Sequence, residues 1–447
     1  MAGLVAARSL ANRGVGVLLL ARPGTIGGSF RPKLIGGREV PVGPRFLELG
    51  YEDDPLTSPA LDSYVPGMHG HRAFTPRVRT FIECEANIEV EKVSRMAVQR
   101  NRMRVPDFLF SVDLCRTRDL FTARENSAIR RETRLAETRL GAAGVRNSAN
   151  YARRSVAWAS LANHGPTFHA AVIEALGNRI APDGVRRTLA PYARKLWLTV
   201  FHPRTINQAF RGLEPDFKPR REIFTPKGGF GRMLGSLEDG IRDYGGLIQE
   251  YESVDVSTSA DGAHIVRVDS DLTVRCDHIV FAGSPSDAGA PQAGALGRFP
   301  AQIVWVEVEF GVPADDFPTL IHILDRDCPL YRISAGSTAP GVFCLEYSGA
   351  LSLDEALRRA QTDLGTHVPE LQGAAVAVLE GITIQQVSYS GANVARMRES
   401  LKVLEQRRES NRVHFTGGLT AVGADSLNEQ VVQGLRIAEL IASEIDS

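Results

Sequence analysis

The sequence has no excess charge of either sign. Its 447 residues include 52 lysines and arginines and 52 aspartates and glutamates, so the formal net charge at pH 7 is zero. A protein that binds nucleic acid usually carries an excess of basic residues, because it must neutralise phosphates. The charge balance therefore argues against nucleic acid or an anionic membrane as the main partner.

Closely spaced cysteines are also missing. The chain has five cysteines, an odd number, and no C-x-x-C pair. This argues against a disulfide framework and a structural zinc site, and it favours a reducing cytoplasm. His164 and His169 lie five residues apart, which does not place two ligands on one face of a helix. No metal site is predicted.

Long hydrophobic runs and hydrolase motifs are absent as well. No apolar run approaches the roughly 18 residues of a transmembrane helix, and the longest near the start covers residues 15–21. The sequence contains no G-x-S-x-G elbow and no Walker lysine loop. We expect neither a membrane span nor hydrolysis or phosphoryl transfer.

The first thirty residues predict a helix, a tight turn and a strand. Apolar residues recur at helical spacing from Leu4 to Ala11, and Gly14 follows as a helix-ending glycine. Residues 15–20, V-G-V-L-L-L, are typical of a buried parallel strand. The pair Gly27-Gly28 comes shortly after that strand.

This opening resembles the flavin amine oxidase superfamily, which includes protoporphyrinogen oxidase, phytoene desaturases and UDP-galactopyranose mutase. Those proteins begin with a strand, a G-x-G-x-x-G turn, a helix, a second strand, an acidic residue and a Gly-Gly pair that approaches FAD. Here the match begins inside the glycine turn, of which only Gly3 is present. The chain is thus expected to be truncated relative to the family, unless an incorrectly assigned start codon hides upstream residues.

Two positions near the second strand depart from the family. Ala21 stands where the resemblance places an acid that binds the ribose hydroxyls, and Arg22 follows it. An arginine there suits the 2′-phosphate of NADP, which makes NADP a rival cofactor. The pair Gly27-Gly28 still favours a flavin.

Two later blocks continue the resemblance. Residues 224–233, F-T-P-K-G-G-F-G-R-M, contain Gly228 and Gly229 and precede a predicted helix and a strand over 247–254. In the family, a valine equivalent to Val254 contacts adenine through its backbone. A hairpin over 264–276 and a strand over 277–285 follow. Near the C-terminus, residues 412–418 predict a strand that ends in Gly417 and Gly418, and residues 428–441 predict a helix.

The three blocks imply one discontinuous domain. We predict an α/β fold with a Rossmann-like FAD-binding domain made of residues 1–80, 222–299 and 401–447. Residues 81–221, with helical patterns and no strand alternation, and residues 300–400, with alternating segments, form a second α+β substrate domain. The cofactor residues implied by the resemblance are Gly3, Arg22, Gly27, Gly28, Gly228, Gly229, Val254, Gly417 and Gly418.

Candidate substrate residues come from two segments. Residues 191–197, P-Y-A-R-K-L-W, and residues 327–333, D-C-P-L-Y-R-I, resemble the substrate side of mutase-like and protoporphyrinogen-oxidase-like members. The resemblance points to Lys195, Trp197, Tyr331 and Arg332, although the size of Trp197 favours a place in the core and Arg332 could form an ordinary surface ion pair. Residues 95–154 hold 14 arginines, which form either a solvated helical cap or a site for an anionic ligand.

The resulting hypothesis is an FAD-dependent oxidoreductase that acts on a small anionic or sugar-linked substrate. No side chain is assigned a catalytic role, because the flavin carries the chemistry in such enzymes. One alternative is a flavin-less homologue that acts as a binding or scaffolding protein, motivated by the missing glycines, Ala21 and Gly418. The other is a non-redox flavoenzyme similar to UDP-galactopyranose mutase.

Overall fold

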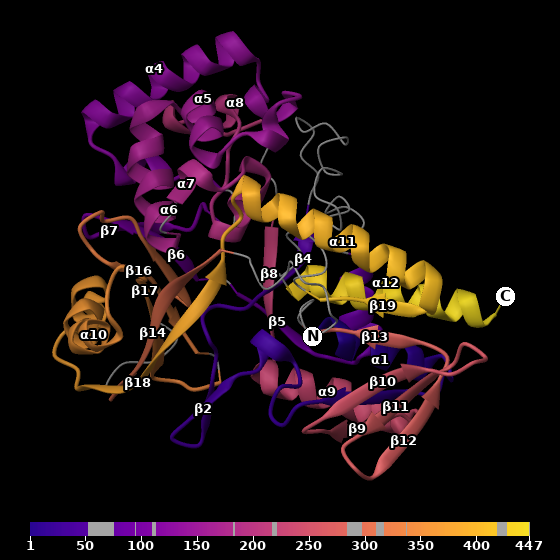
Figure 1. Cartoon of the computed structure of the whole chain (residues 1–447). Helices are drawn as coiled ribbons and strands as arrows, with labels where there is room; N and C mark the ends of the chain where they lie inside the picture. The colour runs from indigo at the N-terminus through magenta and orange to yellow at the C-terminus, as the bar shows by residue number, and fades with distance from the viewer. Residues whose placement is uncertain are drawn as a thin grey trace.

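The structure is a computed structural model of the chain. It describes all residues except 52–75, 94, 110–112, 182–183, 217–220, 284–296, 310–316, 337, 418–426 and 447. Figure 1 shows three regions: helices and short strands around the chain termini, a seven-stranded sheet and a lobe of helices above that sheet. We call them the nucleotide region, the large sheet and the helical lobe.

The nucleotide region contains two pairs of parallel strands. β1 (Leu18–Ala21) pairs with β9 (Leu247–Glu250), and β13 (Ile279–Phe281) pairs with β19 (Val413–Phe415). α1 (Ala2–Asn12) contacts both α9 (Gly229–Asp243) and α12 (Leu427–Ile445). The predicted helix, turn and strand at the start of the chain are confirmed, with the strand beginning at Leu18.

A small antiparallel sheet extends this region. It consists of β10 (Val254–Thr258), β11 (His264–Val268) and β12 (Leu272–Cys276), which confirms the predicted hairpin. The single strand predicted over 247–254 is wrong, because β9 ends at Glu250 and Val254 begins β10. The carboxylate of Asp269, in the turn between β11 and β12, accepts a 2.7 Å hydrogen bond from the amide of Ser253, in the loop between β9 and β10. This bond holds the loop against the small sheet.

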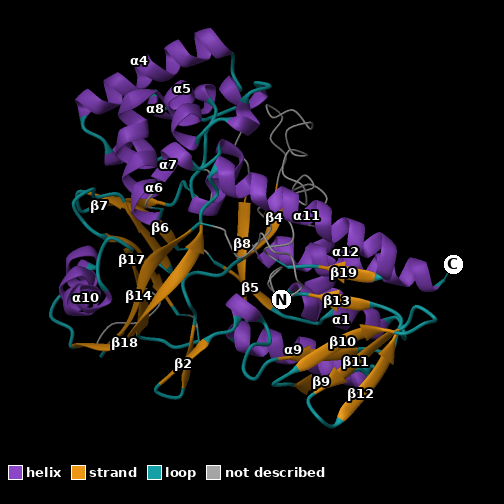
Figure 2. Ribbon diagram, in the orientation of Figure 1, coloured by secondary structure: helices purple, strands orange, loops and turns teal. Residues whose placement is uncertain are grey.

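The large sheet has seven strands and stands apart from the small sheet (Figure 2). Its order is β18 (Val376–Val387), β14 (Arg298–Val308), β17 (Val342–Ser348), β16 (Leu330–Ala335), β15 (Leu320–Ile323), β6 (Met96–Arg100) and β7 (Met103–Pro106). All neighbours are antiparallel except β15 and β6. The apolar side chains of α10 (Leu353–His367) bury one face.

Several elements of the large sheet and its surroundings cross the predicted segment limits. Residues 81–221 were expected to lack strands, but they contribute β6 and β7. The central residues of β6 are buried in succession, so its sequence lacks the alternation of a half-exposed strand. Likewise, β14 spans the predicted boundary at 299, and α11 (Gly391–Asn411) spans that at 400.

The helical lobe surrounds an aromatic core. It comprises α4 (Ala123–Leu140), α5 (Val156–Phe168), α6 (Ala175–Ile180), α7 (Gly184–Arg187) and α8 (Pro203–Phe210). Phe168 packs against Phe121, Phe201 and Phe210 at centroid distances of 6.0 to 6.1 Å. α4 begins at a capping box in which the Thr122 hydroxyl and the Glu125 carboxylate each accept a backbone amide of the other residue.

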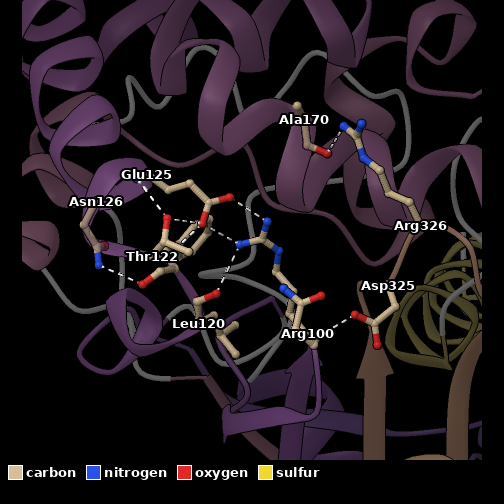
Figure 3. Close-up of polar contacts among 10 residues, drawn as sticks. Arg100, Leu120, Thr122, Glu125, Asn126, Ala170, Asp325 and Arg326 are labelled. Atoms are coloured by element: carbon tan, nitrogen blue, oxygen red, sulfur yellow. Dashed lines mark hydrogen bonds and ion pairs between the residues drawn. The ribbon is translucent and has the colours of Figure 1, made fainter.

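Polar contacts attach the lobe to the large sheet (Figure 3). The guanidinium of Arg100, at the end of β6, donates to both carboxylate oxygens of Glu125 at 2.6 and 3.1 Å. Arg326, just after β15, donates to the carbonyl of Ala170 at 2.5 Å. These contacts fix the lobe on the edge of the sheet.

Short strands link the nucleotide region to the large sheet. β2 (Lys33–Ile35) pairs with β3 (Arg38–Val40), and β8 (Arg221–Pro226) pairs with both β4 (Leu47–Tyr51) and β5 (Val90–Lys92). A π-helical turn covers Thr80–Glu85. Within the described part of the chain, no helix combines the length and apolarity needed to cross a bilayer.

Candidate functional site

The loop after β1 places the first glycine pair against α9. Gly27 and Gly28 have φ values of 88° and 59°, a region that side chains other than glycine rarely adopt. A Cβ atom on Gly27 would lie 2.6 Å from Cδ1 of Leu234. Glycine is therefore required for both the backbone conformation and the close approach, while Arg22 is exposed at the end of β1.

The second glycine pair begins α9. Gly228 and Gly229 have φ values of 80° and 83°, and a Cβ atom on Gly229 would lie 2.2 Å from Cγ2 of Thr338, in the turn after β16. The start of α9 thus touches the large sheet. Its first amide groups have no partners within the helix, which is the arrangement that binds phosphate in dinucleotide sites.

A third close approach joins α1 to the ends of β13 and β19. A Cβ atom on Gly3 would lie 2.4 Å from the Cβ of Ala282, and one on Gly417 would lie 3.0 Å from the carbonyl oxygen of Ala282. The amide of Gly417 donates to the side chain of Gln433, on α12, at 2.8 Å. Predicted cofactor residues from opposite ends of the chain therefore meet at the carboxyl ends of two parallel strands, where open α/β sheets bind ligands.

A cavity separates the nucleotide region from the large sheet. Its volume is about 50 Å³. Residues of the nucleotide region and adjoining loops line one side, and residues near β15 and β16 line the other: Ser29, Phe30, Arg45, Phe46, Gly229 and Phe230, facing Thr319, Ser334, Ala335 and Thr338. The cavity thus lies between Gly229, at the start of α9, and the strand β16 that carries Tyr331 and Arg332.

Three of the four predicted substrate residues lie together beside this cavity. The guanidinium carbon of Arg332 lies 4.5 Å from the ring centroid of Trp197 and 5.6 Å from that of Tyr331. Phe46, which lines the cavity, packs edge-on against Trp197 at 6.0 Å. Trp197 has a φ of 57°, an uncommon conformation for a bulky residue that indicates local strain.

Glu346 holds Arg332 in place. Nε and Nη2 of Arg332 donate to the two carboxylate oxygens at 2.5 and 2.6 Å, and both side chains are more than nine-tenths buried. Burial opposes the charged guanidinium, but the attraction of Glu346 outweighs it and raises the pKa of Arg332. Burial raises the pKa of the Tyr331 hydroxyl, which lies 3.4 Å from Glu346.

His322 and Ser334 extend this polar cluster and were not identified from the sequence. His322 lies opposite Arg332 in the pairing of β15 with β16, and its ring lies 5.8 Å from that of Trp197. Burial and the nearby Arg332 lower the pKa of His322, so its ring is neutral. Among the described residues, neither ring nitrogen of His322, nor Oγ of Ser334, nor Nη1 of Arg332 has a hydrogen-bond partner.

The remaining predicted site residues either lie away from the cavity or fall outside the described residues. Val254 is 40% exposed at the start of β10. Gly418 and the side chain of Lys195 lie outside the described residues. The signal that could have revealed His322 is its position inside the apolar strand L-I-H-I, where a polar side chain is costly unless it has a role.

Comparisons with known proteins give matches at the level of structure. No family model and no curated protein sequence matches the chain. Reduced UDP-galactopyranose mutase superposes with a TM-score of 0.68 at 11% identity, covering 98% of this chain and 91% of the mutase. Putrescine oxidase bound to putrescine gives 0.58 at 13% identity, with 99% and 97% covered.

A third solved structure also superposes on the chain. A protein from Exiguobacterium sp. 255-15, assigned as a protoporphyrinogen oxidase, gives a TM-score of 0.60 at 12% identity and covers 98% of this chain and 96% of its own. The chain shares its fold with these three structures. The α/β fold and the resemblance inferred from separated glycine motifs are therefore confirmed at the level of the fold.

Proposed function

We propose that this protein is an FAD-dependent oxidoreductase of the flavin amine oxidase superfamily that acts on a small substrate. The observation that carries the proposal is the placement of three glycine-bearing segments, at Gly3, Gly27 and Gly229, where backbones approach closely around the nucleotide region. In this proposal residues 1–80, 222–299 and 401–447 bind FAD, and residues 81–221 and 300–400 hold the substrate.

The residues present fit an extended dinucleotide at its diphosphate. Glycine turns with positive φ and the start of α9 offer backbone amide groups without side-chain obstruction. The ribose hydroxyls need a different acidic residue as their hydrogen-bond acceptor, because Ala21 has no carboxylate. Glu250 lies opposite Ala21 in the pairing of β1 with β9, and it accepts the amide of Gly24 at 3.2 Å. We propose Glu250 as the acid of this ribose site.

The substrate side of the proposal rests on the cluster around Arg332. Bound flavin would supply the redox chemistry by accepting a hydride from a C–N or C–C bond. Arg332, oriented by Glu346, presents Nη1 to an anionic or hydroxyl-bearing group, and neutral His322 offers a ring nitrogen to the same region. The ring of Trp197 lies beside both side chains. Five free cysteines agree with action in the reducing cytoplasm.

Absorption spectroscopy of the purified protein tests the proposal. We expect flavin bands in the protein as isolated or after incubation with FAD and gel filtration. Glu250→Gln should bind FAD more weakly than the wild type, while Glu252→Gln, two residues further on, should bind it equally. Protein that stays colourless under both conditions would refute FAD binding and would favour the flavin-less scaffolding alternative, whereas retention of NADP would favour that cofactor.

A second candidate is a non-redox flavoenzyme that acts on a nucleotide sugar. The TM-score of 0.68 to reduced UDP-galactopyranose mutase, higher than the 0.58 to putrescine oxidase, favours it. One assay distinguishes the two proposed functions. A mutase would isomerise UDP-galactopyranose without consuming oxygen, whereas an oxidase would bleach its flavin when an amine is added under anaerobic conditions.

A further inference from the structure

Two histidines and a glutamate converge at the edge of the nucleotide region opposite the glycine turns. His278 lies directly before β13, His414 lies within β19, and Glu444 lies in the last turn of α12. These elements run side by side near the C-terminal end of the chain (Figure 1). Because β13 and β19 are parallel, His278 marks their amino ends, whereas Gly417 marks their carboxyl ends.

The three ligand atoms form a compact triangle. Nδ1 of His278 and Nε2 of His414 are 3.1 Å apart, and Oε2 of Glu444 lies 3.6 and 3.9 Å from them. The nearest point equidistant from all three atoms lies about 2.1 Å from each, and a tetrahedral ion slightly above their plane would lie about 2.2 Å from each, within the range of Zn–N and Zn–O bond lengths of about 2.0 to 2.2 Å. One ion therefore fits between them without movement of the backbone.

The carboxylate oxygen of Glu444 approaches both ring nitrogens. A single proton can join the two ring nitrogens, but the carboxylate oxygen is more than 3.5 Å from both, beyond hydrogen-bond range. The same oxygen nevertheless lies near both nitrogens, as it would if all three shared one cation. His278 and His414 are stacked at a 30° interplanar angle, and His414 is fully buried.

We propose that His278, His414 and Glu444 bind one divalent transition-metal ion, with zinc as the fitting example. Two imidazoles and a carboxylate are a common ligand set for zinc, and a water molecule would complete a tetrahedron. The site lies away from the proposed flavin site, so its role is to clamp α12 to β13 and β19. This site is independent of the proposed function.

The elements that carry the three side chains pack against one another through apolar contacts. The apolar contacts of Leu10, Ala438 and Ile441 with Val280 pack α12 onto the strands near the cluster. Rigid elements therefore supply all three ligands. No spacing motif in the sequence indicates this cluster, because 136 residues separate the two histidines.

Cobalt is a suitable probe, because Co²⁺ occupies such sites and absorbs visible light strongly when it is tetrahedral. The exposed thiols of Cys84 and Cys115 are first alkylated, so that they cannot bind metal. We expect one Co²⁺ per wild-type chain, with visible absorption that Zn²⁺ abolishes by displacement. Zn²⁺ should also raise the unfolding temperature of the wild-type protein.

Substitution of the proposed ligands tests whether these side chains bind the metal ion. His278→Gln and Glu444→Gln should weaken binding by more than about 100-fold, beyond the effect of changing an outer-shell partner. Glu439→Gln, on the same helix, should bind as the wild type does. The buried His414 can be left unchanged, so a folding defect does not confound the test. Absence of saturable Co²⁺ binding, or unchanged binding in both ligand variants, would overturn the proposal.

Discussion

Glycines with a positive φ are visible in the sequence and also shape the candidate cofactor site. Gly229 combines a φ of 83° with a Cβ position 2.2 Å from Thr338, whereas Gly235, six residues later in α9, has open space around it. We expect Gly229→Ala to destabilise the protein by about 1–2 kcal/mol through backbone strain, with added cost from the contact. Gly235→Ala should stabilise it slightly, because alanine favours helix.

Urea unfolding of both glycine variants measures this difference, and absorption spectroscopy measures the FAD that each retains. Gly235→Ala serves as the matched control, since it adds the same methyl group to the same helix. Equal stability and equal FAD retention in the two variants would contradict the assignment of Gly229 to the cofactor side of the cavity.

The buried pair of Arg332 and Glu346 gives a second prediction at this scale. Replacing Arg332 with methionine leaves the Glu346 carboxylate buried without its partner, which should cost about 3–5 kcal/mol of unfolding free energy. The partly exposed pair of Arg242 and Glu238 should contribute no more than about 1 kcal/mol when Arg242 is replaced in the same way. Chemical denaturation of the two variants tests the contrast, and similar losses would show that burial is not the cause.

His164 predicts a dependence of stability on pH. Its ring is fully buried between Ser160 and the carbonyl of Phe201, and burial lowers its pKa from 6.5 to about 3. The unfolded chain therefore takes up this proton first, and stability is lost as the pH falls below 6.5, by about 1.4 kcal/mol per pH unit until the folded-state pKa is reached.

Comparing the pH dependence of unfolding in wild type and His164→Gln tests this link. The variant should show a shallower loss of stability between pH 6 and pH 4, regardless of its stability at neutral pH. His278→Gln is not a suitable control, because it alters the cluster with His414. Parallel curves for wild type and His164→Gln would contradict the prediction.

At the scale of elements, α4 presents an arginine-rich face. Arg124, Arg130, Arg131, Arg134 and Arg139 are all exposed along this helix. Other arginines of the segment pair with acids of the chain, such as Arg100 with Glu125 and Arg104 with Glu370. The segment is thus partly a salt-bridged cap and partly an open basic surface.

We expect the double variant Arg130→Ala, Arg131→Ala to fold normally and to bind an anionic probe more weakly. Heparin is a practical probe, and wild-type binding should weaken as salt rises, because exposed charges are screened. Arg242→Ala is the control, since Glu238 and Asp239 already accompany that arginine. Identical affinities across a salt titration would contradict an anion-binding role for α4.

At the scale of the whole molecule, cofactor binding should couple the regions. FAD bound between the nucleotide region and the large sheet would stabilise the folded state by about 2.7 kcal/mol when its free concentration is 100 times the dissociation constant. Differential scanning calorimetry at increasing FAD should therefore show a rising unfolding temperature. An unfolding temperature independent of FAD would contradict binding to the folded protein.

The local periodicity of the sequence determined the elements of the nucleotide region. The spacing from Leu4 to Ala11, the glycines at 228 and 229 and the hairpin over 264–276 each predict structure from neighbouring residues alone, and the structure contains the corresponding α1, α9 and β11–β12 elements. Their order along the chain was sufficient to identify the fold, because turns and helix ends depend on residues close in sequence.

Only the tertiary structure decided which distant side chains meet. Pairing of β15, β16 and β17 brings His322, Arg332 and Glu346 into one row, and pairing of β13 with β19 brings His278 to His414. Strand register and helix packing set these contacts, and neither is encoded in the spacing of residues tens to hundreds of positions apart. The buried polar cluster and the proposed metal site therefore arise from the folded arrangement, whereas the glycine turns arise from local sequence.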